Sequence, residues 1–191
     1  MVDPPYGIGA SYKKQYHKNS MTKYSCKEWD NEIPQKSYFD ELFRISENCI
    51  IWGANYFVEF LPVSKNWIVW NKMQPEGVSF SMHELAFYSG KGQAKIFTHY
   101  NGGNRVANNP EKALKYIRIH PTQKPVALYR WILQNYAKPG DKIIDTHSGS
   151  GSLACACHIE KFDFLAVEKD IDYFNDSVKR LYELRSQGVL F

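Results

Sequence analysis

The sequence predicts an α/β fold, in which a mostly parallel, doubly wound sheet carries helices on both faces. Short apolar runs typical of buried strands alternate with amphipathic segments typical of helices along most of the 191 residues. A glycine turn at 146–152 follows one of these runs and leads into a helical segment, as in doubly wound folds. An apolar content of 43% suffices for a packed core, and the length fits one domain.

The first half of the chain is expected to hold two helices and three strands. A polar segment at 9–36 has no hydrophobic period and is interpreted as a long loop. Ser37 is then expected to cap a helix that reaches residue 46. This helix is expected to turn four side chains to the core, namely Phe39, Leu42, Phe43 and Ile45. Strands are predicted at 49–52, 67–70 and 84–88, and a short helix at about 54–61.

The second half begins with a loop region at 90–119, rich in Gly and Asn, with a short strand predicted at 95–98. Pro125 opens a helix that Pro139 and Gly140 close. Strands are predicted at 142–145 and 162–167, on either side of a helix at about 153–160. Asp170 is expected to cap a last helix, and its inward side chains are expected to be Ile171, Phe174, Val178 and Leu181.

The charge is mild overall and basic in one segment. The formal net charge is +4, but residues 91–130 carry eight Lys or Arg against one acid, Glu111. This pattern suits a phosphate backbone, although a solvated basic face is the commoner explanation. The four cysteines have no zinc-like spacing and are interpreted as reduced thiols of a cytosolic protein, so no metal site is expected. No signal peptide or 18-residue apolar run is present.

The first candidate site is the turn Asp3-Pro4-Pro5-Tyr6. Proline fixes its own φ and keeps the preceding residue extended, so this turn has little conformational freedom. It presents a carboxylate, backbone carbonyls and a ring, a set that suits a planar group bearing an NH₂. Trp29 and Asp30, like Trp52, Trp67 and Trp70, are interpreted as packing residues rather than base contacts.

The second candidate site is the segment from Asp145 to Gly151, which includes the glycine turn. Such a turn between a strand and a helix lets backbone amides approach a ligand closely. Glu168 closes the next predicted strand, where a carboxylate can accept both hydroxyls of a ribose. The pattern favours a nucleoside ligand, and it lacks the third spaced glycine of a dinucleotide site and the GKS or GKT of a P-loop.

These blocks and their order resemble the amino-group DNA methyltransferases of the permuted beta type. The segments 50–57 and 67–72 also resemble phage and prophage members of that family. The resemblance also rests on 120–125 (His-Pro-Thr-Gln-Lys-Pro). It implies a Rossmann-like methyltransferase sheet with an antiparallel edge, S-adenosylmethionine as cofactor, duplex DNA with a flipped base as partner, and a role in restriction-modification. A homodimer and a place in the cytoplasm of a bacterium or phage-infected host are further expectations.

The resemblance also assigns residues to roles. The catalytic residues are expected to be Asp3, Pro4, Pro5 and Tyr6. The cofactor is expected to contact Thr122, Lys124, Asp145, His147, Ser148, Gly149, Gly151 and Glu168. The DNA is expected to contact Lys91, Lys95, Arg105, Lys112, Lys115 and Arg118. His147 stands where the family usually has Phe. Asp at the first position of the catalytic block goes mostly with adenine N6 in the family.

One methyltransferase domain is expected over 1–191, made of a catalytic half at 1–89, a target-recognition region at 90–119 and a cofactor half at 120–191. Relatives carry several tens of residues before the catalytic block, whereas two residues precede Asp3 here, so a truncated front end is expected. Besides an active adenine methyltransferase, two alternatives stay open. One is a remnant that binds DNA without transferring methyl groups, and the other is an enzyme acting on cytosine N4 or on an RNA or protein amide.

Overall fold

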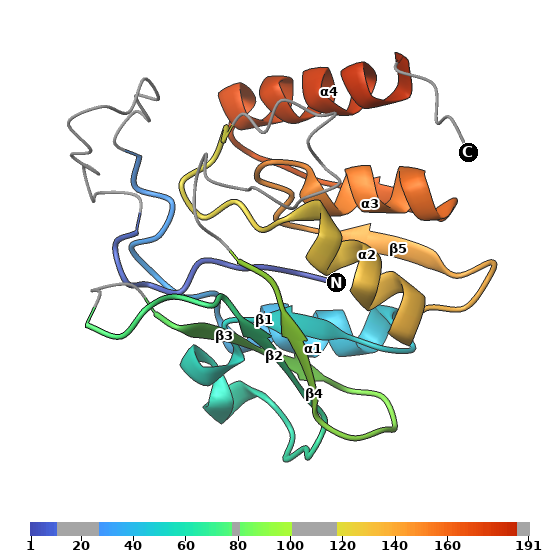
Figure 1. Ribbon diagram of the computed structural model, residues 1–191. Helices are drawn as coiled ribbons and strands as arrows, with labels where there is room; N and C mark the ends of the chain where they lie inside the picture. Colours follow the sequence, from blue (N-terminus) through green and yellow to red (C-terminus); the bar gives the residue numbers. More distant parts are fainter. Residues whose placement is uncertain (11–26, 78–80, 101–117, 187–191) are drawn as a thin grey trace. The chain divides into compact units, whose positions relative to one another are not determined.

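The computed structural model describes residues 1–10, 27–77, 81–100 and 118–186 (Figure 1). The chain forms two compact units, Met1–His99 and Tyr100–Phe191. Each unit has its own sheet and its own helices, and each is described by itself.

The first unit is built on a mixed sheet. Its strands are β1 (Ile50–Trp52), β2 (Trp67–Asn71), β3 (His83–Tyr88) and β4 (Lys95–Thr98), in the order β1-β3-β2-β4. β2 and β4 are parallel, and Val2 forms a parallel bridge with Ile51. β3 is antiparallel to both of its neighbours. The antiparallel strand therefore lies inside this sheet and not at its edge, because β3 pairs with β1 on one side and with β2 on the other.

Helix α1 (Lys36–Ile45) covers the hydrophobic core of this unit. Gln35 occupies the N-cap position without a side-chain bond, so the prediction that Ser37 caps the helix was wrong. Ile45, predicted to face the core, is exposed at the end of the helix. The core joins residues of α1 to those of the sheet and of the turn after β1, namely Val2, Phe39, Leu42, Cys49, Ile51, Ala54, Phe57 and Phe87.

The segment after β1 forms two short 3₁₀ turns, η1 (Ala54–Tyr56) and η2 (Val58–Phe60), instead of the single helix expected at 54–61. Gly53 begins η1 with a φ of 67°. Each turn is closed by bonds between residues three apart, such as Phe57 N–H to the Ala54 carbonyl. The turns place two aromatic residues, Tyr56 and Phe57, next to the end of β1.

The second unit has two parallel strands, β5 (Lys142–Asp145) and β6 (Asp163–Ala166), paired from Lys142↔Asp163 to Asp145↔Ala166. They are connected by α3 (Ser152–Glu160), the crossover helix that parallel strands require. Helix α2 (Val126–Tyr136) packs against α3, and an ion pair of 2.6 Å joins Arg130 Nε to Glu160 Oε1.

The last helix, α4 (Ile171–Ser186), is rotated relative to the prediction. Three of the residues expected to face inward are exposed, with exposed fractions of 66% for Ile171, 42% for Phe174 and 50% for Val178. The buried side is formed instead by Tyr173, Ser177 and Leu184. The reason is contact with the glycine turn, because Ser177 lies against Gly151 and Arg180 donates to the Ser150 carbonyl.

Candidate functional site

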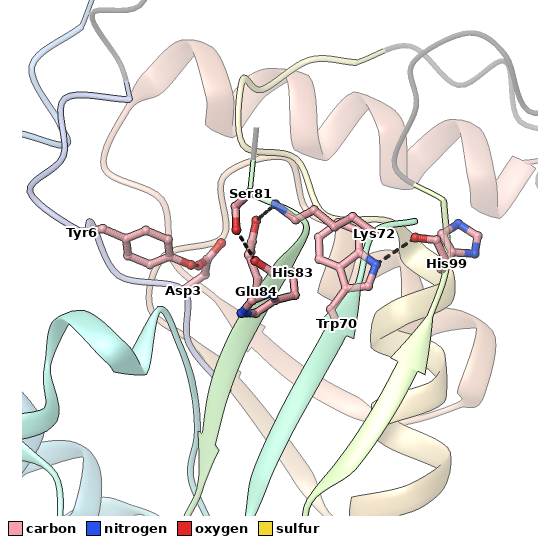
Figure 2. A network of polar contacts seen from close by, with 8 residues as sticks. All are labelled: Asp3, Tyr6, Trp70, Lys72, Ser81, His83, Glu84 and His99. Atoms are coloured by element: carbon pink, nitrogen blue, oxygen red, sulfur yellow. Dashed lines mark hydrogen bonds and ion pairs between the residues drawn. The ribbon is translucent and has the colours of Figure 1, made fainter. Parts of the chain in front are cut away.

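The turn Asp3-Pro4-Pro5-Tyr6 begins where the chain leaves the sheet. Val2 exchanges backbone hydrogen bonds with Ile50 and Trp52, so Asp3 follows directly after the paired residue. The Tyr6 hydroxyl donates to Asp3 Oδ1 at 2.6 Å, which joins the carboxylate and the ring within four residues (Figure 2). The two candidate groups are therefore held together by a direct bond and not only by the stiffness of the prolines.

The Tyr6 ring occupies the space that Gly53 leaves open. A Cβ built at position 53 would lie 2.0 Å from the Tyr6 ring, so no larger residue fits there. Tyr6 also stacks on Tyr56, with ring centroids 5.1 Å apart and planes at 16°, and it meets Phe57 edge-on at 6.1 Å. The segment that follows β1 thus supplies the aromatic residues on which Tyr6 packs. Sequence reasoning did not assign Tyr56 or Gly53 to the site.

Asp30 is a further residue that sequence reasoning missed. It was interpreted as a packing residue, yet its carboxylate accepts the backbone N–H groups of Tyr6, Gly7 and Ala10, at the end of the Asp3–Tyr6 turn and just after it. Its side chain is 1% exposed. The signal in the sequence is weak, because 23 residues separate Asp30 from Tyr6 and no spacing rule connects them.

A polar group lies at the same end of the first sheet. Lys72 Nζ is 2.5 Å from Glu84 Oε1 and 5.2 Å from the centre of the Trp70 ring. Trp70 Nε1 donates to the His99 carbonyl at 3.0 Å. Figure 2 shows this group together with Asp3 and Tyr6. Trp70 is fully buried and pairs with Glu84 across β2 and β3, which agrees with its expected packing role.

In the second unit, the glycine turn joins β5 to α3 and is fixed by Glu168. Gly149 and Gly151 have φ angles of 50° and 68°, which a residue with a side chain rarely adopts. Gly149 N–H donates to Glu168 Oε2 at 2.8 Å, and Asp170 N–H donates to Glu168 Oε1 at 2.9 Å. The glycine turn and the acid expected from the sequence are therefore in direct contact, with Glu168 holding the turn and the start of α4.

The segment 120–125 lies against the same turn. The His120 ring is 3.7 Å from the position of a Cβ at Gly149 and packs on Tyr173 of α4, with ring centroids 4.4 Å apart. Thr122 Oγ1 lies 3.1 Å from His120 Nδ1, and Lys124 is buried. Two blocks that are 20 or more residues apart in the sequence thus meet at one site.

Asp145 and His147 stand at the start of the turn. Asp145 is buried at the end of β5, and its Oδ1 accepts the His147 N–H at 3.1 Å. His147 Nδ1 lies 3.0 Å from Thr146 Oγ1. Ser148 continues the turn by donating its N–H to the Val167 carbonyl at 2.9 Å. The residues expected to contact a cofactor in this unit therefore surround the glycine turn.

Arg180 of α4 donates hydrogen bonds to the end of the glycine turn. Its Nη1 donates to the Ser150 carbonyl and to Ser152 Oγ, both at 2.9 Å. A Cβ at Gly151 would lie 2.9 Å from Ser177 Cβ, so α4 packs directly on the turn. Neither Arg180 nor Ser177 was singled out from the sequence, since their role depends on the rotation of α4.

A buried thiol lies close to this site. Burial raises the pKa of Cys157 in α3 to about 12, and the nearby Asp145 carboxylate adds to the shift. Burial also raises the pKa of Cys49 in the first unit. Both thiols thus keep their protons at neutral pH and are poor nucleophiles.

The candidate DNA contacts are only partly within the described residues. Lys91 and Lys95 are exposed in the first unit, and Arg118 is half-buried at the start of the described part of the second. Arg105, Lys112 and Lys115 lie outside the described residues. Within the described ranges, no three His, Cys, Asp or Glu side chains form a group that could hold a metal ion. No described helix is long and apolar enough to cross a membrane.

The chain matches known proteins in sequence and in fold. The type II methyltransferase M2.MboI of Moraxella bovis is 31% identical to it over 65 residues, which are 34% of this chain and 24% of that relative. The chain thus spans well under two thirds of the length of this curated relative.

Two solved structures share the fold. The M1.HpyAVI–SAM complex superposes with a TM-score of 0.55 at 21% identity, over 76% of this chain and 81% of that chain. The PvuII DNA methyltransferase, named cytosine-N4-specific, superposes with a TM-score of 0.55 at 14% identity, over 97% and 82%. These similarities confirm the α/β class. The model of the DNA methylase family, N6_N4_Mtase, matches residues 1–179, and because that match covers most of the sequence, the chain belongs to this family.

Proposed function

We propose that the protein transfers a methyl group from S-adenosylmethionine to an exocyclic amino nitrogen of a base in DNA, and that this nitrogen is N6 of adenine. The observation that carries the proposal is the bond between Tyr6 and Asp3 in the turn that opens the family match. This turn holds a carboxylate and an aromatic ring together, as recognition of a flat amino-bearing base requires.

The residues around the glycine turn fit the proposed cofactor. Each carboxylate oxygen of Glu168 accepts one backbone N–H, and a carboxylate oxygen has room for a second donor. Glu168 can therefore accept the two ribose hydroxyls without releasing the turn. Asp145, His147, Ser148, Gly149 and Gly151 line the same turn, and Thr122 and Lys124 are proposed to contact the methionine end. S-adenosylmethionine, when bound, supplies a methyl group on a sulfonium sulfur.

The contribution of the catalytic turn is positioning and electrostatics. The amino nitrogen of adenine is a poor nucleophile because its lone pair is delocalised into the ring. Asp3 and the Pro4 carbonyl would each accept a hydrogen bond from the amino group, which draws the nitrogen toward a tetrahedral geometry with a usable lone pair. Tyr6 presents its ring to the base. Transfer would form the nitrogen–carbon bond as the carbon–sulfur bond of the sulfonium breaks, with a neutral thioether leaving and the nitrogen losing one proton to solvent. Such a displacement depends on alignment more than on acid–base power.

The target base has to leave the duplex before it can reach this turn, at a cost of about a few kcal/mol. Lys91, Lys95 and Arg118 are proposed to contact phosphates of the bound DNA, together with Arg105, Lys112 and Lys115. Since the reaction requires access to DNA, we place the protein in the cytoplasm of a bacterial or phage-infected cell. We also propose that the protein functions within a restriction-modification system. We further propose that its sequence blocks have the permuted order, with the catalytic turn first.

Cytosine N4 is the second candidate for the target. The family name covers both N6 and N4 methylation, and one structure of similar fold is named cytosine-N4-specific. Asp3 at the first position of the catalytic block favours adenine, through the resemblance described above. A remnant that binds DNA without turnover is the third candidate.

The deciding experiment is transfer of tritiated methyl groups from S-adenosylmethionine to unmethylated DNA, followed by nucleoside analysis of the product. N6-methyl-2′-deoxyadenosine supports the proposal, whereas N4-methyl-2′-deoxycytidine assigns the other base. DNA binding without incorporation of label identifies the remnant, provided that calorimetry shows cofactor bound to the same preparation.

A further inference from the structure

Asp30 accepts hydrogen bonds from most of the backbone N–H groups of residues 6–10, which begin with the last residue of the catalytic turn. Its Oδ1 accepts the N–H groups of Tyr6 at 2.6 Å and Gly7 at 3.0 Å, and its Oδ2 accepts the Ala10 N–H at 2.7 Å. The Asp30 carbonyl accepts the Gly9 N–H at 3.0 Å. Four of the five N–H groups of residues 6–10 therefore bond to this one residue.

The sequence of the turn prevents a continued sheet ladder and favours a curved backbone. Pro4 and Pro5 have no N–H group, so the chain cannot continue a sheet ladder beyond Val2. Gly7 and Gly9 have φ angles of 69° and 65°, and these positive values let the chain curve around the carboxylate. Glycine also leaves this segment free to adopt other conformations when the carboxylate is absent.

The hydrogen bonds of Asp30 include one to Tyr6, the residue whose ring is proposed to meet the base. The Tyr6 N–H bonds to Asp30, while the Tyr6 hydroxyl bonds to Asp3. Tyr6 is thus fixed at both ends, by Asp30 at its backbone and by Asp3 at the tip of its side chain. Hydrogen bonds from N–H groups to an ionised carboxylate are shorter and stronger than hydrogen bonds between neutral groups. Asp30 is only 1% exposed, so water competes little for these bonds.

We propose that Asp30 is a positioning residue for methyl transfer, which fixes the backbone of Tyr6 and thereby the relation of the Tyr6 ring to the Asp3 carboxylate. This inference rests on the proposed function. Asp30 touches neither base nor cofactor, and it acts through the turn. Its loss lowers the rate of the chemical step while cofactor binding, which involves residues of the other unit, is retained.

The test compares Asp30→Ala with a variant that loses a different buried polar anchor of the same unit. Asn66 is 9% exposed and donates its Nδ2 to the Gly90 carbonyl, away from the catalytic turn, so Asn66→Ala is the matched control. Single-turnover methyl transfer, calorimetry with S-adenosylmethionine and thermal melting are measured for each. A second variant, Asp30→Asn, keeps the shape but turns one donor group toward the N–H groups.

Displacement of reacting groups by about 1 Å costs on the order of 10²-fold in rate. Asp30→Ala is therefore expected to lower the single-turnover rate by about 10²-fold. Asp30→Asn is expected to show a large part of that loss, and both variants are expected to keep the cofactor affinity of the wild type. Asn66→Ala is expected to melt earlier without a comparable loss of rate. Equal rate losses for Asp30→Ala and Asn66→Ala at equal melting temperature would overturn the positioning role.

Hydrogen exchange separates this inference from the proposed function. In the wild type, the amides of Tyr6, Gly7, Gly9 and Ala10 are expected to exchange slowly, and in Asp30→Ala quickly, whether or not the protein methylates DNA. Slow exchange in a wild type that transfers no methyl group keeps the role of Asp30 in holding the turn and rejects the proposed function. Fast exchange in the wild type, or no change in the variant, rejects the role of Asp30 whatever the activity.

Discussion

Among single substitutions, a change at Asp3 is expected to affect the proposed chemistry most directly. Its carboxylate bonds to the Tyr6 hydroxyl at 2.6 Å and is the proposed acceptor of the amino group. Removing one preorganised electrostatic partner of a reacting group costs about 10²–10³ in rate. Asp3→Ala is therefore expected to lose turnover by that factor and to bind S-adenosylmethionine as before, measured by methyl transfer and calorimetry. Asp40→Ala, which removes an exposed carboxylate of α1, is the control. A variant of Asp3 that keeps about a tenth of the rate or more would exclude it as the acceptor.

Cys157 gives a prediction about pH. Its pKa is raised from 9.0 to about 12 by burial and by Asp145. Between these values the folded chain keeps the thiol proton while the unfolded chain loses it, so the unfolded state binds fewer protons. The free energy of unfolding therefore falls as the pH rises above about 9. Urea unfolding at about pH 8 and about pH 10.5 should show a smaller decrease for Cys157→Ala than for the wild type. An identical decrease in both proteins contradicts the assignment.

The orientation of α4 can be tested with two apolar residues of the same helix. Leu184 is 8% exposed, whereas Val178 is 50% exposed, although the sequence places Val178 on the apolar stripe. Leu184→Ala is expected to lower the free energy of unfolding by about 2 kcal/mol, at the lower end of the range for buried leucines. Val178→Ala is expected to change it by less than about 0.5 kcal/mol. Denaturant unfolding of both variants measures the difference, and the reverse order of losses would show that the stripe faces inward.

Substitutions at two glycines, Gly151 in the glycine turn and Gly140 outside it, separate the cost of backbone strain from the cost of a steric clash. Gly151 and Gly140 both have positive φ angles, 68° and 91°, but a Cβ at 151 meets Ser177 Cβ at 2.9 Å while a Cβ at 140 meets nothing within 4 Å. Gly140→Ala is expected to cost about 1–2 kcal/mol from backbone strain. Gly151→Ala adds overpacking of about 1–3 kcal/mol and displaces α4 from the turn. Thermal melting compares the two, and equal losses would mean that α4 does not pack on Gly151.

The elements that were well predicted are those whose signals are local. The strand at 142–145 is bounded by a proline–glycine turn before it and the glycine turn after it, and the structure has it at Lys142–Asp145. The acid at 168 follows the next strand as predicted, and the structure adds that it accepts a hydrogen bond from the turn. The face of α4 could not be predicted because it is set by two contacts with the turn, Ser177 and Arg180, and not by hydrophobicity.

Asp30 and Gly53 show the same limit at the catalytic turn. Their roles depend on backbone donors and a ring that reach them from residues 6–10, far away in the sequence. The local signals of the turn itself, two prolines and an acid, predicted a rigid carboxylate and ring. They gave no indication of which residue fixes that turn to the rest of the unit, since any buried acceptor could do so.

At the scale of the whole molecule, the net charge of +4 is too small to drive the proposed DNA binding, which would therefore depend on where the cations lie. Lys91 and Lys95 are exposed, and they begin the basic stretch in the sequence. Cations that meet phosphates release counterions, and the logarithm of the binding constant then falls with the logarithm of the salt concentration, with a slope of about −0.9 for each neutralised phosphate. The contribution of each lysine can therefore be read from the salt dependence.

We predict that the double variant Lys91→Gln and Lys95→Gln binds all DNA sequences more weakly and to the same degree, and that the log–log slope becomes shallower by about one unit per lost contact. Fluorescence anisotropy with two unrelated duplexes over a series of salt concentrations measures both quantities. Lys138→Gln, an exposed lysine of the second unit outside the basic stretch, is the matched control and should leave the slope unchanged. If the loss is confined to one duplex, the two lysines read bases, and if the slope stays the same, they do not contact phosphates and the DNA surface lies elsewhere.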